Sequence, residues 1–244
     1  MKFLGPNACE EAIKRGQLQV LRIAHPAWNR TLALRQMAKN ADVTVHKEPL
    51  ESLDRRSEGK RHQGVVGEGG SATFIQMPEL LKILSLQGST GLVLLLDGIT
   101  DSNNFGAILR SAAAANVSAV IFPERRSAQV NESAVRASAG TVGLVPLVRV
   151  VNLGRAIDEL KEAGLWVYGM SASGDKSQNY LEETFDTATA IVVGSEGDGL
   201  RLKIFERCDK ILKIEMPGKT ESLNVSATAA IALFRVLAAR EKKY

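Results

Sequence analysis

The sequence lacks the long apolar run of a membrane protein and the cysteine framework of a small secreted one. Its 244 residues include no run near the ~20 apolar residues that span a bilayer. Residues 1–6 lack the apolar stretch of a signal peptide. Cys9 and Cys208 form no motif with each other, and the three histidines are scattered, so we expect neither a disulfide nor a metal site. These absences favour a reducing compartment, the cytoplasm or alternatively an organelle.

Two common nucleotide-binding motifs are absent as well. The loop Gly194–Gly199 holds three glycines, but it follows neither the G-x-G-x-x-G dinucleotide pattern nor a P-loop, which ends in Gly-Lys-Ser/Thr. A nucleotide-dependent oxidoreductase is therefore excluded. Three glycines in six residues still indicate a sharply turning backbone with exposed amides, which can bind a flat purine or a ribose. The alternative is a plain turn between a strand and a helix.

The charge of the chain is unevenly distributed. The composition is that of a globular protein, with 45% apolar and 24% charged residues and a net charge of +4. Residues 1–72 hold 12 Lys and Arg against 8 Asp and Glu, whereas residues 73–244 hold 19 of each. The whole positive excess thus lies in the first third, which suggests a polyanionic partner. A solvated surface with a modest imbalance is the alternative.

Apolar runs and polar helical patterns alternate from residue 92 onward, which predicts an α/β fold with a parallel sheet covered by helices. Several runs are apolar almost throughout, as expected for strands that are buried on both faces. The expected strands are 92–96, 118–122, 145–150, 165–170, 189–193 and 210–214, and the expected helices are 104–115, 131–138, 152–163, 199–206 and 223–240.

The first part of the chain reads as a separate small α/β unit. We expect a helix over 8–15 capped by Asn7, a strand over 18–24, a helix from Asn29 or Thr31 to Lys39 and a strand over 43–46. The polar run 54–62 predicts a loop, the segment 68–77 a linker, and 79–86 a helix that Pro78 begins. We therefore divide the chain into residues 1–70, a linker with the first helix at 71–90, and 91–244.

Three polar segments each follow a predicted strand of the larger part. They are 97–110, Gly194–Gly199 and 214–226. The carboxyl ends of parallel strands meet at one edge of a sheet, where open α/β folds build their sites. The three segments therefore predict one composite pocket.

Single residues in these segments allow two interpretations. Asn104 can cap the helix that it begins or bind a substrate, and Arg110 lies about one and two-thirds turns further on, away from the face of Asn104. Its long side chain could still reach the pocket; a capped helix with one surface Arg is the alternative. Ser222 or Asn224 can cap the last helix, and Glu196 is the one long carboxylate of its loop.

Taken together, the three motifs resemble those of the SPOUT RNA methyltransferases, in the SpoU/TrmH branch. They are Asn104-Phe105-Gly106 with Arg110, Gly194-Ser195-Glu196-Gly197 and Ser222-Leu223-Asn224, and the resemblance covers residues 90–240. It implies a SPOUT domain with a C-terminal trefoil knot, a homodimer, and methyl transfer from S-adenosylmethionine to a ribose 2′-hydroxyl of RNA, without a metal. Knots are too rare to expect from composition or periodicity.

The resemblance also implies roles for single residues. Those expected to bind the cofactor are Gly194, Ile214, Leu223, Met216 and Gly197, and those expected to carry the chemistry are Asn104, Arg110, Glu196, Ser222 and Asn224. A guanidinium is an awkward general base, because its pKa is too high. We therefore expect Arg110 to stabilise the developing alkoxide and to hold a neighbouring phosphate, which itself could receive the proton.

The N-terminal part resembles a small RNA-binding domain of ribosomal-protein type, found in bacterial methyltransferases that modify a guanosine of large-subunit (23S-type) rRNA. Residues 7–16 and 57–66 carry this resemblance, and segments 101–104, 125–129 and 146–150 fit the same subgroup. It implies an RNA surface, for which the candidates are Arg55, Arg56, Lys60, Arg61, His62 and Gln63. A solvated loop is the alternative for this run.

Other functions remain open at this point. A tRNA ribose methyltransferase would share the catalytic domain but differ in its extension, and a resistance-type rRNA methyltransferase would share the architecture with another target. A non-catalytic RNA-binding factor of ribosome assembly would be expected to lose Arg110, Glu196 or Asn224, yet all three are present.

Overall fold

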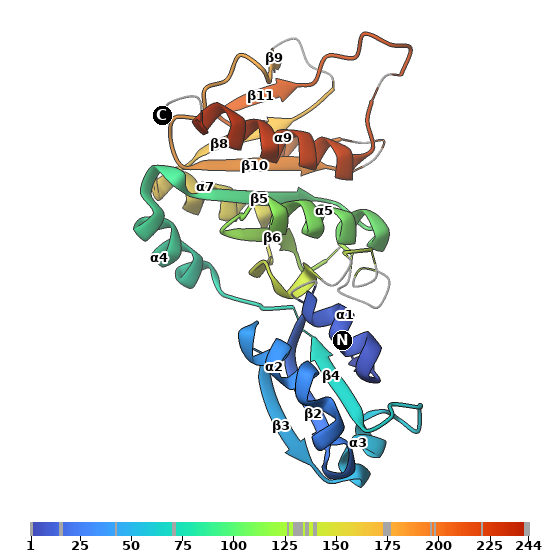
Figure 1. Ribbon diagram of the computed structural model, residues 1–244. Helices are drawn as coiled ribbons and strands as arrows, with labels where there is room; N and C mark the ends of the chain where they lie inside the picture. The colour runs from blue at the N-terminus through green and yellow to red at the C-terminus, as the bar shows by residue number, and fades with distance from the viewer. Residues whose placement is uncertain are drawn as a thin grey trace. The chain divides into compact units, whose positions relative to one another are not determined.

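The computed structural model divides the chain into two compact units, Met1–Ser71 and Ala72–Tyr244 (Figure 1). We call them unit 1 and unit 2. The structure describes residues 2–14, 17–41, 43–69, 72–125, 127–128, 134, 137–138, 141–172, 177–195, 197, 199–220 and 222–241. Among these residues, no helix combines the length and the hydropathy that crossing a bilayer requires.

Unit 1 is a four-stranded sheet with helices. Its elements are β1 (Lys2–Leu4), α1 (Pro6–Lys14), β2 (Leu18–Ala24), α2 (Leu32–Asn40), β3 (Thr44–Glu48), α3 (Leu50–Arg56) and β4 (Val65–Gly69), with the 3₁₀ turns η1 (His25–Ala27) and η2 (Asn29–Thr31) before α2. The strand order is β1-β4-β2-β3. β3 pairs only with β2, in parallel, and therefore forms one edge of the sheet.

Three local expectations for unit 1 are wrong. Asn7 does not cap α1, because Gly5 turns the chain at φ +94° and Pro6 already begins the helix. The expected loop 54–62 begins late, since α3 extends through Arg56. The expected linker is shorter on both sides, because β4 takes Gly69 and α4 begins at Met77.

Unit 2 confirms the parallel sheet covered by helices. Its seven strands run in the order β7-β6-β5-β10-β8-β11-β9, and every pair is parallel. The elements are α4 (Met77–Gln87), η3 (Gly88–Thr90), β5 (Leu92–Asp97), α5 (Ser102–Ala114), β6 (Ala119–Pro123), η4 (Thr141–Gly143), β7 (Leu147–Val150), α7 (Leu153–Glu162), β8 (Trp166–Met170), β9 (Ser177–Asn179), β10 (Thr189–Gly194), α8 (Leu202–Phe205), β11 (Lys210–Lys213) and α9 (Val225–Glu241).

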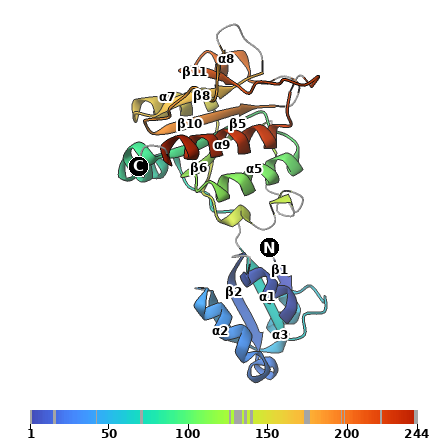
Figure 2. The same cartoon turned by 45° about the horizontal axis from the view of Figure 1, so that its top comes forward.

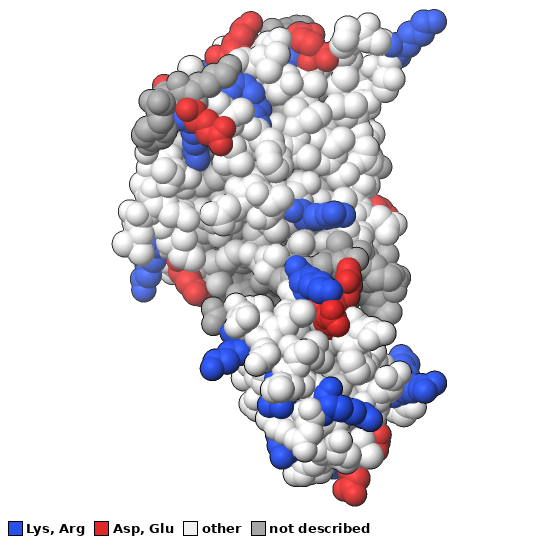
Figure 3. Space-filling model, in the orientation of Figure 1, with Lys and Arg blue, Asp and Glu red and all other residues white. Residues whose placement is uncertain are grey.

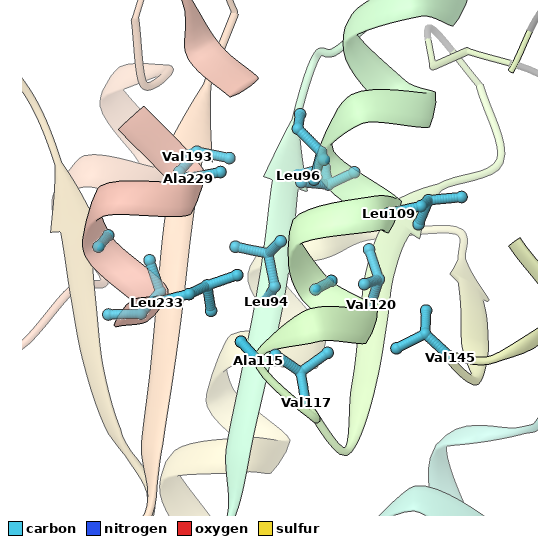
Figure 4. Close-up of a cluster of buried hydrophobic side chains, with 14 of the residues drawn as sticks. Leu94, Leu96, Leu109, Ala115, Val117, Val120, Val145, Val193, Ala229 and Leu233 are labelled. Atoms are coloured by element: carbon cyan, nitrogen blue, oxygen red, sulfur yellow. The ribbon is translucent and has the colours of Figure 1, made fainter. Parts of the chain in front are cut away.

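The central strands of this sheet are buried on both faces. Leu94 and Leu96 of β5 belong to a core cluster with α5 and α9, whereas Val93 and Leu95 belong to a second cluster with α4 and α7. Figure 4 shows the first cluster, in which Leu109 of α5 and Leu233 of α9 lie over the same face of the sheet. α5 and α9 lie side by side in both ribbon views (Figures 1 and 2). This double cover explains why the strands read as apolar runs.

The structure of unit 2 departs from the sequence expectations at turns and helix ends. The helix expected over 199–206 is only α8, because Gly199 is held in a bridge with Ser195. β9 was not expected, and the helix expected over 131–138 falls largely outside the described residues. β7 is shorter than the strand expected over 145–150.

Both cysteine thiols are protected by burial. Burial raises the pKa of Cys9 to about 12, and it raises that of Cys208 to about 12 as well. The thiolate is the reactive form of cysteine. Both side chains are therefore inert near neutral pH and fill space, as expected from the sequence.

Arg240 fastens the end of α9 to the edge of the sheet where β5 and β10 begin. Its guanidinium donates hydrogen bonds to the carbonyl oxygens of Thr90 (2.7 Å), Gly91 (3.3 Å), Phe185 (3.4 Å) and Thr187 (3.0 Å) and to the hydroxyl of Thr189 (3.2 Å). Burial lowers the pKa of Arg240, whose head is surrounded by these acceptors.

We expect Arg240→Ala to lower the free energy of unfolding by about 2–3 kcal/mol, because several partly buried carbonyl groups lose their donor. Chemical denaturation of the full chain measures this. The control is Arg155→Ala, which removes only an exposed i,i+4 pair with Glu159 and should cost under about 0.5 kcal/mol. Equal stabilities of the two variants would contradict the role given to Arg240.

Candidate active site

A cavity of about 710 Å³ opens at the carboxyl ends of β8 and β10, in unit 2. The segments that line it come from the end of each strand and from two later stretches of chain: Met170–Ala172, Val193–Ser195, Gly197, Gly199, Leu200, Leu202, Phe205, Ile214, Met216, Ser222–Val225 and Thr228. Every described residue of the lining is uncharged. Its walls combine apolar side chains with hydroxyl groups and exposed backbone, as in sites for small organic ligands.

The glycine loop after β10 is tightly closed. The amide of Ser195 donates to the carbonyl of Gly199 and the amide of Gly199 donates back to Ser195, both at 3.1 Å. A Cβ on Gly194 would lie 2.1 Å from the carbonyl carbon of Gly199, so only glycine fits there. Gly197, at φ +91°, allows the turn itself. The loop is thus held as a compact wall of the cavity.

A buried carboxylate at the end of β5 anchors the chain after this loop. Asp97 is 1% exposed, and its oxygens accept hydrogen bonds from the amide of Arg201 at 2.9 Å and from its Nε at 2.6 Å. The guanidinium also forms an ion pair with Asp97. A buried carboxylate is retained only where such partners compensate it. This link was not expected from the sequence, although Asp97 begins the polar segment 97–110 that contains the first motif.

The first and third motifs meet through their asparagines. Asn224 Nδ2 donates to Asn104 Oδ1 at 2.9 Å, and Asn224 Oδ1 accepts from the amide of Ser226 at 2.8 Å. Asn224 thus caps α9, one of the two expected alternatives. Asn104 does not cap α5: the carboxylate of Asp101 accepts from the amide of Asn104 at 2.7 Å and performs that role.

Arg110 lies in the middle of α5 with an exposed side chain, and it is not part of the cavity wall. Its guanidinium forms no hydrogen bond or ion pair with another side chain or carbonyl within the described ranges. Six residues separate it from Asn104, which places the two on different faces of the helix. The exposed guanidinium of Arg110 is therefore available for an external anion.

The structure therefore brings most of the sequence-predicted pocket together. Seven of these residues line the cavity: Gly194, Gly197, Ile214, Met216, Ser222, Leu223 and Asn224. Asn104 reaches it through Asn224, Arg110 stands outside it, and Glu196 lies outside the described residues. The individual roles of these residues stay predictions. The end of β8 was missed, although Met170 ends an expected strand and the strand-end rule could have pointed to it.

Four of the six candidate RNA residues of unit 1 line a second hollow. Lys60, Arg61, His62 and Gln63 line it with the 3₁₀ turn that contains Pro26. Their loop is held by Arg30, which donates to the carbonyl of Gln63 at 2.7 Å, and by left-handed backbone at Gln63 (φ 53°).

The six candidates differ in their freedom to bind. His62 is buried, and its Nε2 lies 2.7 Å from Asp54 Oδ1. Arg56 forms ion pairs with Glu48 (3.4 Å) and Glu68 (3.1 Å) across the sheet. Both side chains therefore support the unit, whereas Arg55, Lys60, Arg61 and Gln63 are exposed.

Comparison with known families gives two matches that divide the chain as the structure does. The SpoU rRNA Methylase family matches residues 91–234, and a family described as RNA 2′-O ribose methyltransferase substrate binding matches residues 4–72. A curated protein from Xylella fastidiosa (strain 9a5c), the 23S rRNA (guanosine-2′-O-)-methyltransferase RlmB, is 35% identical over 241 residues, which cover 98% of this chain and 96% of that protein.

Solved structures show the same fold. The SpoU methyltransferase AviRb from Streptomyces viridochromogenes in complex with AdoMet superimposes with a TM-score of 0.67 at 22% identity and covers 99% of this chain and 91% of its own. The A. aeolicus TrmH/SpoU tRNA modifying enzyme gives a TM-score of 0.57 at 28% identity, but it covers only 68% of this chain and 83% of its own.

Proposed function

The chain belongs to the SpoU rRNA methylase family, and we propose that it transfers a methyl group from S-adenosylmethionine to the ribose 2′-hydroxyl of a guanosine in 23S-type rRNA. The observation that carries this proposal is the single cavity at which the second and third motifs meet, with the first motif hydrogen-bonded to its rim. The relative from Xylella fastidiosa, similar over both units, supports the choice of substrate.

The cavity suits this donor in size and in chemistry. Its apolar residues, such as Leu202, Phe205 and Ile214, can pack on the adenine, while backbone and hydroxyl groups of the glycine loop and of Ser222 can hold the ribose and the amino acid. When bound, S-adenosylmethionine supplies a methyl group already activated by its sulfonium, so no metal is needed to activate it. The protein has mainly to align the hydroxyl and to remove its proton.

Arg110 is our candidate for stabilising the oxygen that becomes charged. Its exposed guanidinium can bind a phosphate of the RNA and place positive charge beside the 2′-oxygen, which lowers the energy of the developing alkoxide. The proton then passes to the bound phosphate rather than to Arg110, which is protonated already. Asn104 and Asn224, joined by their hydrogen bond, would orient the ribose, and Glu196 would fix the pocket.

Unit 1 would supply most of the affinity for RNA. Its positive excess contrasts with the neutral remainder of the chain, and phosphate neutralisation provides much of the affinity for nucleic acid. The tRNA modifying enzyme from A. aeolicus covers only 68% of this chain, whereas the rRNA enzyme from Xylella fastidiosa covers 98%, which favours rRNA over tRNA. We place the reaction in the cytoplasm, where ribosomes are assembled.

We also propose that the chain works as a homodimer. The outer face of α9 carries Ala227, Ile231, Phe234 and Ala238 at helical spacing, and Phe234 is 47% exposed. A second copy could cover this apolar stripe. A monomeric mass in sedimentation equilibrium at micromolar concentration would overturn the homodimer.

The C-terminal trefoil knot is a further proposal. After β10 the chain reaches β11 beyond β8 in the sheet order and then returns to α9, which packs on β10, and this order is compatible with a return through the loop that follows β10. An experimental trace in which residues 214–224 pass beside the loop 195–200, not through it, would exclude the knot.

One labelling experiment tests the function. The full protein is incubated with methyl-labelled S-adenosylmethionine and unmodified 23S rRNA or total tRNA, and alkali-resistant linkages are mapped. We expect one labelled guanosine in the rRNA and background label in tRNA, because 2′-O-methylation blocks alkaline cleavage. Label confined to tRNA would support the tRNA alternative, and no label in either RNA, despite measured cofactor binding, would overturn the proposal.

A further inference from the structure

A cationic side chain is stacked on the only tryptophan of unit 1. Arg35 of α2 places its guanidinium carbon 4.2 Å from the ring centroid of Trp28, and Lys47 of β3 places its Nζ 5.3 Å from that centroid. Trp28 is half-buried against the core of unit 1, which holds its ring in place. We call Trp28 with the two cations over its ring the layer. A guanidinium that lies over one ring can present its other planar face to a second ring, and Arg35 is only half-buried.

The positive charge at this layer is not compensated within the described residues. Arg35 Nε is buried without a hydrogen-bond partner, and no ion pair involves Arg35, Lys39 or Lys47 there. Arg22 Nε on the same sheet is buried in the same way, but the terminal nitrogens of Arg22 form ion pairs with Glu48 and Glu68. The segment 25–47 contains four Lys or Arg and a single acidic residue, Asp42, which the structure does not describe.

An open groove of about 450 Å³ lies between α2 and β3, beside this layer. Its walls are Trp28, Arg35, Lys39 and the segment Val43–Val45. Arg35 and Lys39, four residues apart, share one face of α2. β3 is an edge strand, so its outer backbone groups have no neighbouring strand in the sheet. Figure 3 shows several separate Lys and Arg side chains on the surface of unit 1.

We propose that this groove binds an unpaired nucleotide of the RNA substrate, at a site separate from the loop Lys60–Gln63. The base stacks on the outer face of Arg35, whose inner face lies on Trp28, and Lys39 and Lys47 hold the flanking phosphates. Planar stacking with cations on both sides suits single-stranded RNA, whose bases are free to stack on aromatic or guanidinium planes. An acidic protein segment could form ion pairs with these cations, but it would have no ring to stack on the guanidinium of Arg35. The inference rests on the proposed function.

Two conservative variants of the full protein separate stacking from charge. Arg35→Lys keeps the charge but removes the planar group, so affinity for a fluorescein-labelled oligoadenylate should fall about five- to hundredfold with an unchanged salt dependence. Lys39→Gln should weaken binding severalfold and reduce the slope of log affinity against log salt by about 0.7. Lys82→Gln, which removes an exposed lysine of α4 in unit 2, is the matched control and should change neither.

Fluorescence anisotropy measures these affinities, and melting temperatures check that the variants are folded. The proposal is overturned if Arg35→Lys and Lys39→Gln bind as the wild type does, or if a strand with abasic sugars binds as well as oligoadenylate. It is also overturned if the variants lose affinity for ribosomal particles but not for oligoadenylate, because loss of a stacking site for an unpaired nucleotide would weaken the binding of oligoadenylate as well.

Methylation of 23S rRNA by the same preparations distinguishes this proposal from the proposed function. If the wild type methylates and the groove variants do so with an unchanged KM, only the groove is refuted. If the wild type binds S-adenosylmethionine but methylates no RNA, the proposed function fails, while the oligoadenylate measurements still decide the groove.

Discussion

Gly194→Ala is expected to abolish binding of S-adenosylmethionine. The added Cβ would lie 2.1 Å from the carbonyl carbon and oxygen of Gly199 and 2.4 Å from the amide nitrogen of Leu200, which are backbone atoms that no rotamer change can remove. Relieving this overlap requires the glycine loop to open, at a cost of about 3 kcal/mol or more. Because that loop forms a wall of the cavity, affinity should fall at least about hundredfold. Isothermal titration calorimetry measures the change.

Gly218→Ala is the control for this variant. Gly218 lies in the chain between two lining segments, a Cβ there meets nothing within 4 Å, and its φ is not in the left-handed region. The Gly218→Ala variant should therefore bind S-adenosylmethionine with the affinity of the wild type. A dissociation constant of Gly194→Ala within threefold of the wild type would show that this loop does not shape the donor site.

Arg110→Ala is expected to lower the methylation rate at saturating substrates by about 10²–10³-fold, the loss that follows removal of one group that stabilises a developing charge. Affinity for S-adenosylmethionine should stay within twofold of the wild type, because Arg110 is not part of the cavity wall. The methylation rate of Arg110→Lys should lie between those of the wild type and Arg110→Ala, because a lysine keeps the positive charge but lacks the planar guanidinium. Single-turnover methylation of 23S rRNA, with calorimetry for the donor, separates the two quantities.

Arg155→Ala removes another exposed arginine, on α7, and should leave the rate unchanged. The result that contradicts our assignment is a lost affinity for S-adenosylmethionine with normal turnover at saturation. Arg110 would then support the donor pocket and take no part in the chemical step.

Much of the larger unit could be predicted from the sequence because its strands are covered on both faces. A run such as Leu92–Leu96 has no polar alternation, and burial on both faces leaves few architectures other than a helix-covered parallel sheet. The strand-end rule then located the pocket, since Ile214, Ser222 and Leu223 do line it. An apolar run and a polar segment that follows it can both be recognised from residues that are neighbours in the sequence.

What the sequence did not reveal depends on partners far along the chain. Asp101 and Asn104 are both good caps by type, and only the hydrogen bond from Asn224 decides that Asn104 points elsewhere. The end of β8 joins the pocket because β8 lies between β10 and β11, an order that crossover connections hide from a linear reading. The groove at Trp28 was missed because its cations come from α2 and β3, and only the fold brings them together.

The hydrogen bonds between Asp97 and Arg201 join residues 104 positions apart, and the hydrogen bond between Asn104 and Asn224 joins residues 120 positions apart. Contacts of such high sequence separation form late, because the chain must lose much of its freedom before they are made. During synthesis the donor pocket therefore stays incomplete until almost the whole polypeptide has left the ribosome. An unfinished chain could not take up S-adenosylmethionine, so ligand uptake would report that maturation is complete.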